Sequence, residues 1–328
     1  MRRRVIILIL TIFATVAAAA AVAQEGTEAK KQLYFFLPVK STAVFKQIED
    51  MWSKVGEKIG KPIEVMTTKD LPFEKPTLRQ TLDWLKTLDE DHQIDISVVT
   101  VMTMFRLEEE GMAFMPLATF QIDKKKYDRS CLFVRKDSPY LQIKEPADRL
   151  AAMKGKTIGY GHSAKSNPVG EMLLFDYDII QSAEEYFNIP GWFGSVEGRM
   201  EELMAGDIEA FIALKIDMKF ATNKDKGFQK EIVPLVCSDE YTNMPMILRS
   251  DMDRGTMYKL RDIMLNIHKD RDFPQLQFIF YAINGHFVPV KPEDYVKYRR
   301  IYDFGRKEGW IDDIGEVTYL DKNRKNKD

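Results

Sequence analysis

The feature that most constrains the fold is a strand, a helix and a second strand that follow one another between residues 33 and 66. Residues 33–37 form a continuous apolar run that ends at Pro38, and residues 62–66 (PIEVM) form the second predicted strand after Gly60. The segment between them has the three- and four-residue spacing of an amphipathic helix. Its apolar positions are Val44, Ile48, Met51, Trp52, Val55 and Ile59. A β-α-β unit of this kind makes its strands parallel, so the sequence predicts an α/β protein.

The alternation of helix and strand continues along most of the chain. Helical spacing covers residues 78–88, 102–111, 147–153 and 200–205, and the chain is mostly helical from Thr256 onward. Further strands are predicted at residues 94–99, 132–135, 157–160, 208–213, 232–236 and 246–249. The pattern predicts mostly parallel sheets flanked by helices.

The first residues resemble a secretory leader. Arg2, Arg3 and Arg4 precede an apolar run that ends in the small-x-small triplet Ala21-Val22-Ala23. We therefore expect residues 1–23 to be a signal peptide and the mature chain to lie in the periplasm. A retained membrane anchor is the alternative. No later apolar run is long enough for a bilayer, so no stable membrane insertion is expected after cleavage.

Charge and cysteine content narrow the function further. Without the three arginines of the leader, the formal net charge falls from −2 to about −5, and a mildly acidic mature chain without basic clusters argues against nucleic acid as a partner. Cys131 and Cys237 lie in apolar, strand-like segments, SCLFV and VPLVC. The sequence leaves their pairing open, because a disulfide needs a Cα separation that sequence does not give. Two separate buried thiols are the expected state.

A polar loop follows the predicted strand at residues 157–160 and precedes a helix. The N–H groups of a helix start lack partners and favour negative charge, so this turn predicts an anion or polar-ligand cradle. Its candidate ligand-binding residues are Tyr160, Ser163, Lys165, Ser166 and Asn167. The alternative is an ordinary turn with a serine that caps the helix.

Two other helix starts and one aromatic residue complete the candidate site. Ser41 and Thr42 follow the first strand, and Thr100 and Thr103 follow the strand at residues 94–99. Ser41 and Thr42 suit either a ligand contact or a plain helix cap. Two threonines beside an otherwise apolar strand are unusual for packing alone, so Thr100 and Thr103 favour a ligand contact. Tyr241 is expected to supply an aromatic wall of the site.

Catalysis is the runner-up interpretation. The four histidines (His92, His162, His268 and His286) lack metal-binding spacing, and no nucleophile elbow occurs. The sequence therefore predicts no enzyme, no metal and no cofactor.

Five segments of the chain resemble, in order, the type 2 periplasmic solute-binding proteins. They are residues 91–119, 130–161 (SCLFVRKDSPYLQIKEPADRLAAMKGKTIGYG), 200–213, 244–252 and 286–303. The last segment, HFVPVKPEDYVKYRRIYD, is similar to the C-terminal passage of the PhnD-like, phosphonate-binding branch.

The resemblance implies two α/β lobes joined by two hinge strands, with the ligand between the lobes. Lobe one would comprise residues 32–137 and 246–328, and lobe two residues 138–245. The implied function is capture of a small polar solute, first of all an oxyanion such as phosphonate or phosphate, for delivery to an inner-membrane ABC permease. The alternative role is a ligand-sensing or accessory subunit of a membrane kinase or oxidoreductase.

The chain departs from the branch at two places. Where phosphonate binders carry Ser-Thr-Ser-Gly, this chain has Ser163-Ala164-Lys165-Ser166-Asn167. Where they carry a histidine before a lobe-two helix, this chain has Glu197. A desolvated carboxylate would repel an anion, so Glu197 either faces solvent or indicates another ligand.

Overall fold

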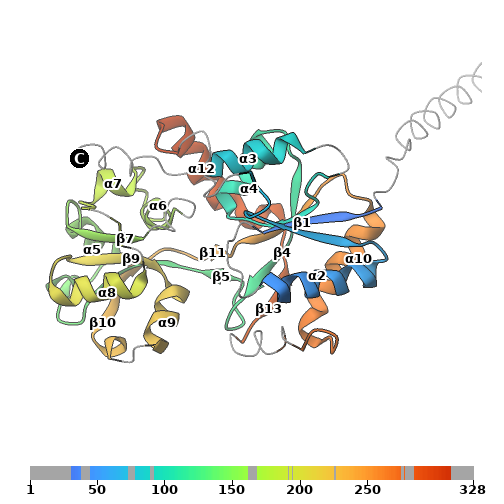
Figure 1. Cartoon of the computed structure of the whole chain (residues 1–328). Coiled ribbons are helices and arrows are strands. Elements are labelled where there is room, and N and C mark those ends of the chain that lie inside the picture. The colour runs from blue at the N-terminus through green and yellow to red at the C-terminus, as the bar shows by residue number, and fades with distance from the viewer. Residues whose placement is uncertain are drawn as a thin grey trace, which may run out of the picture.

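The computed structural model has two lobes, each built on its own sheet and joined by a narrow ribbon (Figure 1). It describes residues 31–37, 45–72, 78–88, 92–161, 168–190, 192–193, 195–224, 227–274, 277 and 284–311. Among these residues, none of the helices is both long and apolar enough to cross a membrane.

The first lobe contains a six-stranded sheet of order β13-β4-β12-β3-β1-β2. Its strands are β1 (Leu33–Leu37), β2 (Ile63–Thr67), β3 (Ile96–Val98), β4 (Phe114–Gln121), β12 (Pro245–Arg249) and β13 (His286–Pro289). Its helices are α2 (Phe45–Ile59), α3 (Leu78–Thr87), α4 (Val101–Glu109) and α10 (Arg254–Asn266). β1 pairs in parallel with β2 and β3, whereas β12 runs antiparallel to both β3 and β4.

Side chains of β1 alternate between two helical layers. Phe35 stacks on Trp52 of α2, with ring centroids 4.3 Å apart, in a core that also includes α10. Phe36 faces the opposite side and meets Trp84 of α3, at 6.3 Å. This alternation, which a strand imposes every second residue, places α3 on one face of the sheet and α2 on the other.

The second lobe contains a five-stranded sheet of order β10-β6-β9-β7-β8. Its strands are β6 (Ser130–Arg135), β7 (Ile158–Gly161), β8 (Trp192–Phe193), β9 (Ala210–Leu214) and β10 (Ile232–Cys237). Its helices are α5 (Pro146–Ala152), α6 (Val169–Phe175), α7 (Ala183–Tyr186), α8 (Val196–Ala205) and α9 (Lys215–Lys224). Short 3-10 turns cover Pro139–Gln142, Phe228–Lys230, Ile267–Lys269 and Pro292–Tyr295.

Both sheets are mixed, mainly because of the connections between the lobes. Strands that follow a helical crossover, such as β7 and β9, are parallel, as predicted. β6, β10 and β12 adjoin the connections between the lobes, and they run antiparallel to their neighbours.

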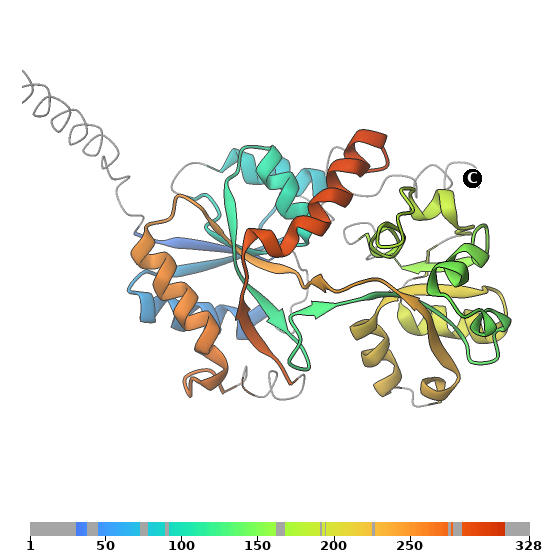
Figure 2. The ribbon, with the colours of Figure 1, turned by 180° about the vertical axis from the view of Figure 1, so that it is seen from behind.

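Two short strands connect the lobes (Figure 2). β5 (Tyr127–Asp128) and β11 (Tyr241–Thr242) pair antiparallel as a separate two-stranded ribbon. β6 follows β5 directly and pairs with β9 and β10, so it belongs to the second sheet. The sequence-based boundary after residue 137 instead left β6 in lobe one. We propose that the lobes divide at the ribbon.

Cys131 and Cys237 form a disulfide, which corrects the expectation of two separate thiols. They are direct partners in the antiparallel pairing of β6 with β10, with Cα atoms 4.1 Å apart. The pairing of strands 106 residues apart brings the two sulfurs together, and local sequence does not reveal that pairing.

The helix α12 (Val296–Glu308) contacts both lobes. Tyr302 packs edge-on against Phe105 of α4, with centroids 5.5 Å apart, and Phe304 packs against Phe175 of α6 at 5.6 Å. One buried hydrophobic cluster therefore continues from the first lobe through α12 into the second.

Candidate functional site

The first-lobe side of the candidate site is the turn from β3 into α4. Thr100 caps α4, and its hydroxyl oxygen accepts a hydrogen bond from the backbone N–H of Thr103 at 3.2 Å. The two hydroxyl oxygens are 2.9 Å apart. Both side chains are half-buried and line a cavity under α3 and α4. The predicted pair is therefore brought together at a helix start, beside space that a ligand can enter.

The second-lobe side is the end of β7, where Gly161 lies against a buried arginine. A Cβ at Gly161 would sit 3.0 Å from the guanidinium carbon and both terminal nitrogens of Arg199. A side chain at this position would push the guanidinium by a few tenths of an ångström, so glycine leaves Arg199 its place against β7. Arg199 is only 4% exposed and belongs to the first turns of α8.

Backbone carbonyls hold this guanidinium in place. Its Nε donates to the carbonyl of Ser195 at 3.2 Å, and its Nη1 donates to the carbonyl of Ile212 in β9. These bonds use two of the five N–H donors of an arginine. Within the described part of the chain, Arg199 forms no direct ion pair.

The charge of Arg199 is only partly compensated. Burial lowers the pKa of its guanidinium, while the carboxylates Asp217 and Glu197 act in the opposite direction. Burial likewise raises the pKa of Asp217, and Arg199 opposes that shift. Glu197 thus lies close enough to support a buried cation, which gives this carboxylate a role other than repelling an anion.

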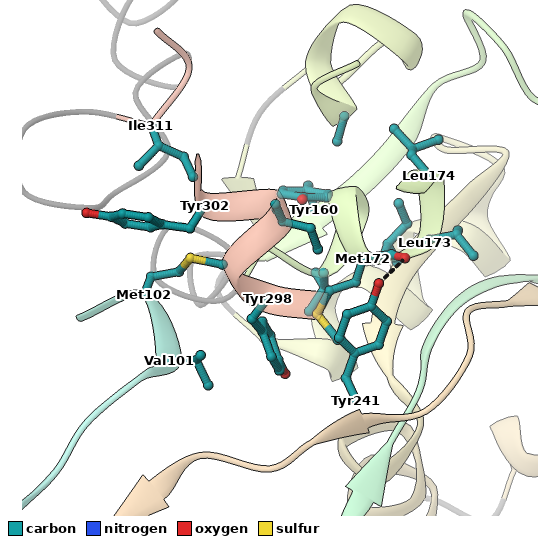
Figure 3. Packing of buried hydrophobic residues seen from close by; sticks show 14 of the residues in the cluster. Val101, Met102, Tyr160, Met172, Leu173, Leu174, Tyr241, Tyr298, Tyr302 and Ile311 are labelled. Atoms are coloured by element: carbon teal, nitrogen blue, oxygen red, sulfur yellow. Dashed lines mark hydrogen bonds between the residues drawn. The ribbon is translucent and has the colours of Figure 1, made fainter. Parts of the chain in front are cut away.

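Two predicted aromatic contacts lie inside the protein. Tyr160 is 0% exposed; its hydroxyl accepts from the N–H of Gly170 at 2.9 Å and bonds the buried Glu171 at 3.1 Å. Tyr241 is 3% exposed, and its hydroxyl donates to the carbonyl of Met172 at 3.1 Å (Figure 3). Both rings are core residues that position α6, and neither presents a face to solvent.

The other predicted residues lie outside the described residues. They are Ser41, Thr42, Ser163, Lys165, Ser166 and Asn167. Gly161 and Pro168 flank the second of these loops, which places its two ends at the carboxyl end of β7 and the start of α6.

Arg199 is the residue that the sequence-based reasoning missed. The signal was present, because Arg199 falls on the same helical stripe as the apolar residues Val196, Met200 and Leu203. A charged residue in an apolar stripe is buried with partners or is functional.

The described part of the chain shows no cluster of side chains that could bind a metal ion. Among those residues, no group of three or more histidine, cysteine, aspartate or glutamate side chains is arranged to hold a metal ion.

The fold is that of a type 2, two-lobed periplasmic binding protein. XAC2383 from Xanthomonas citri, bound to ATP, superposes with a TM-score of 0.61 at 15% identity, over 84% of this chain and 98% of that one. PhnD1 from Prochlorococcus marinus, in complex with methylphosphonate, gives 0.58 at 15% identity, over 85% and 99%. The phosphonate-transporter binding protein PA3383 from Pseudomonas aeruginosa gives 0.54 at 12% identity, over 85% and 88%.

Residues 85–295 match the family described as "ABC transporter, phosphonate, periplasmic substrate-binding protein". The chain belongs to this family. No curated protein matches it in sequence. Family membership confirms the predicted PhnD-like resemblance and the solute-binding role, and it implies a periplasmic location and delivery of a small molecule to an ABC transporter.

Proposed function

We propose that this protein binds a small oxyanion, of the phosphonate or phosphate class, between its lobes and delivers it to an inner-membrane ABC permease. Residues 1–23 would serve as the cleaved leader, and the protein would act by binding without catalysis. The buried guanidinium of Arg199 is the observation that carries the proposal.

The physical argument starts from the cost of burying a charge. A buried cation that lacks an ion-pair partner is expensive, and an anion placed against it removes much of that cost. Arg199 lies at the carboxyl end of β7, the edge of an α/β sheet where ligands bind. Arginine also matches the geometry of phosphate and phosphonate oxygens better than lysine does.

The test is a calorimetric titration of the chain from Gln24 onward with methylphosphonate and inorganic phosphate. Wild-type protein should bind at least one of them, and Arg199→Gln should weaken that binding about 30-fold or more, since loss of a buried charged partner costs 2–5 kcal/mol. Circular dichroism and melting temperature report whether the variant folds.

Arg149→Gln is the matched control. Arg149 also belongs to the second lobe and donates to backbone carbonyls, those of Ile143 at 2.7 Å and Leu235 at 3.1 Å. It lies on α5 and holds carbonyls of a loop and of β10, not the carboxyl end of β7, so its loss should leave the dissociation constant unchanged. Equal effects of the two substitutions, or no binding of either anion by wild-type protein, would overturn the proposal.

A further inference from the structure

The first lobe contains a cavity of about 570 Å³ between its sheet and the pair of helices α3 and α4. This volume lies within the range of small-molecule sites, about 300–1,000 Å³. Most of the cavity lining is apolar, and it includes Phe36, Leu82, Leu85, Ile94, Leu107 and Phe114. Figure 1 shows α3 and α4 side by side above this part of the sheet.

The two ends of the cavity differ in chemistry. One end is formed by Thr100 and Thr103 at the first turn of α4, on the carboxyl side of β3. The far end carries Lys86, Arg249 and Asp251. α4 runs between the two ends and, with nine residues, is about 14 Å long.

The charges of the far end are already paired. The Nε of Arg249 lies 2.6 Å from Asp251, its Nη1 donates to Gln93 at 2.7 Å, and Lys86 pairs with Glu110. An anionic group at this end would have to break those pairs. The polar head of a ligand is therefore better placed at the threonine end.

The rest of the lining favours an apolar group. The hydroxyl of Ser97 already donates to the carbonyl of Phe36 at 2.8 Å, so it does not compete for a polar ligand group. Burial of an alkyl chain against apolar walls is favourable because it removes apolar surface from water. The occupant that suits these walls is an apolar chain.

We propose that the cavity holds the alkyl chain of the ligand, so that the substrate class is alkyl oxyanions, with the chain running from the threonine end along α4. This inference rests on the proposed function, because the proposed function is what places the oxyanion between the lobes. It extends that function by assigning the chain to a site inside the first lobe.

The experiment is a titration series with methyl-, ethyl- and butylphosphonate. Each methylene that enters an apolar site contributes about 0.8 kcal/mol, so affinity should rise about fourfold per methylene. Butylphosphonate should therefore bind roughly sixtyfold more tightly than methylphosphonate, over three added methylenes.

Leu85→Trp fills the cavity from α3. Leu85 is half-buried and lines the cavity, so the larger ring occupies empty space and the variant should fold. It should bind methylphosphonate as the wild type does and lose the gain with chain length. Thr87→Trp is the matched control, because Thr87 is exposed on the same helix and is not among the lining residues. It should keep the gain.

The outcomes separate this inference from the proposed function. Binding of methylphosphonate with no gain for longer chains would overturn the alkyl site and leave the oxyanion receptor standing. A gain that survives in Leu85→Trp would also overturn it, because the chain would then lie elsewhere. Failure of wild-type protein to bind phosphonate of any length would overturn the proposed function itself.

Discussion

At the scale of single residues, Asp128 places a partly buried carboxyl group in β5, one of the two strands that connect the lobes. Its oxygens accept from the backbone N–H groups of Arg129 at 2.7 Å and Ile216 at 3.2 Å. Burial outweighs these bonds and raises the pKa of this carboxyl to about 6. A carboxyl that holds its proton more tightly when folded destabilises the protein as pH rises from its unfolded pKa of about 3.9 to its folded value.

We therefore predict that wild-type protein loses stability relative to Asp128→Asn between pH 4 and pH 7. The difference should change by on the order of 2 kcal/mol in favour of the variant, and it should level off above about pH 7. Urea unfolding of both proteins at several pH values measures it. Titrating groups that are common to both proteins affect both curves alike. A stability difference that does not change with pH would therefore contradict the raised pKa of Asp128.

Residues that follow local rules were predictable from sequence, and residues set by distant contacts were not. Thr100 directly precedes a helical pattern, and its role as a cap follows from that position alone. Tyr160 is also local to its loop, but α6 folds back over its ring, which the sequence does not show. The position of the Arg199 guanidinium depends on Gly161 of β7 and Ile212 of β9, two strands that lie far from it in the sequence.

At the scale of elements, the ribbon of β5 and β11 is the mechanical link between the lobes. Tyr241 of β11 anchors it to α6 through the carbonyl of Met172 and through Asp176, at 3.1 and 3.2 Å. Burial is the main cause that raises the pKa of Tyr241, so its hydroxyl stays protonated as a donor. The ring also packs against Tyr298 of α12, with centroids 5.1 Å apart.

Tyr241→Phe should destabilise the protein by about 1–2 kcal/mol, because the two acceptors lose a buried donor. Thermal unfolding measures the loss. If Tyr241 serves only to anchor the ribbon, the dissociation constant for methylphosphonate should stay within twofold of the wild-type value. A large loss of affinity in a stably folded variant would return Tyr241 to the ligand site where the sequence placed it.

The helices and strands were more predictable from the sequence than the pairing of the strands within each sheet. The strand at residues 33–37 and the helix that follows it were correctly predicted, because β and α spacing are local signals. The predicted lobe boundary after residue 137 left β6 in lobe one, whereas β6 pairs with β9 and β10 of the second sheet. An apolar run such as SCLFV shows that a strand is buried, but its neighbours lie about 80 and 100 residues further along the chain.

At the scale of the whole molecule, α12 couples the lobes. Its ion pairs with α4 include Arg299 with Glu108 and Arg306 with Glu109, so these two acidic side chains lie at the interface between the helices. On the other side, Phe304 meets the second lobe through Phe175. The two lobes should consequently unfold together.

Phe304→Ala should uncouple that unfolding. We expect a loss of about 2–3 kcal/mol and a broader calorimetric transition. The loss should lie below that of a fully buried phenylalanine because the Phe304 ring is only half-buried. Phe220→Ala serves as control, since Phe220 is 41% exposed on α9. The coupling role of α12 would be refuted if both variants melted in one sharp transition at the wild-type temperature.

The disulfide has a topological consequence for the second lobe. Cys131 stands where the chain enters that lobe and Cys237 where it leaves, so the bond closes nearly the whole lobe into a covalent ring. A protease that cuts the backbone once between these cysteines opens the ring without separating the fragments. The lobe can therefore be given new termini in any exposed loop while remaining attached to the first lobe. Only a reductant then releases the pieces.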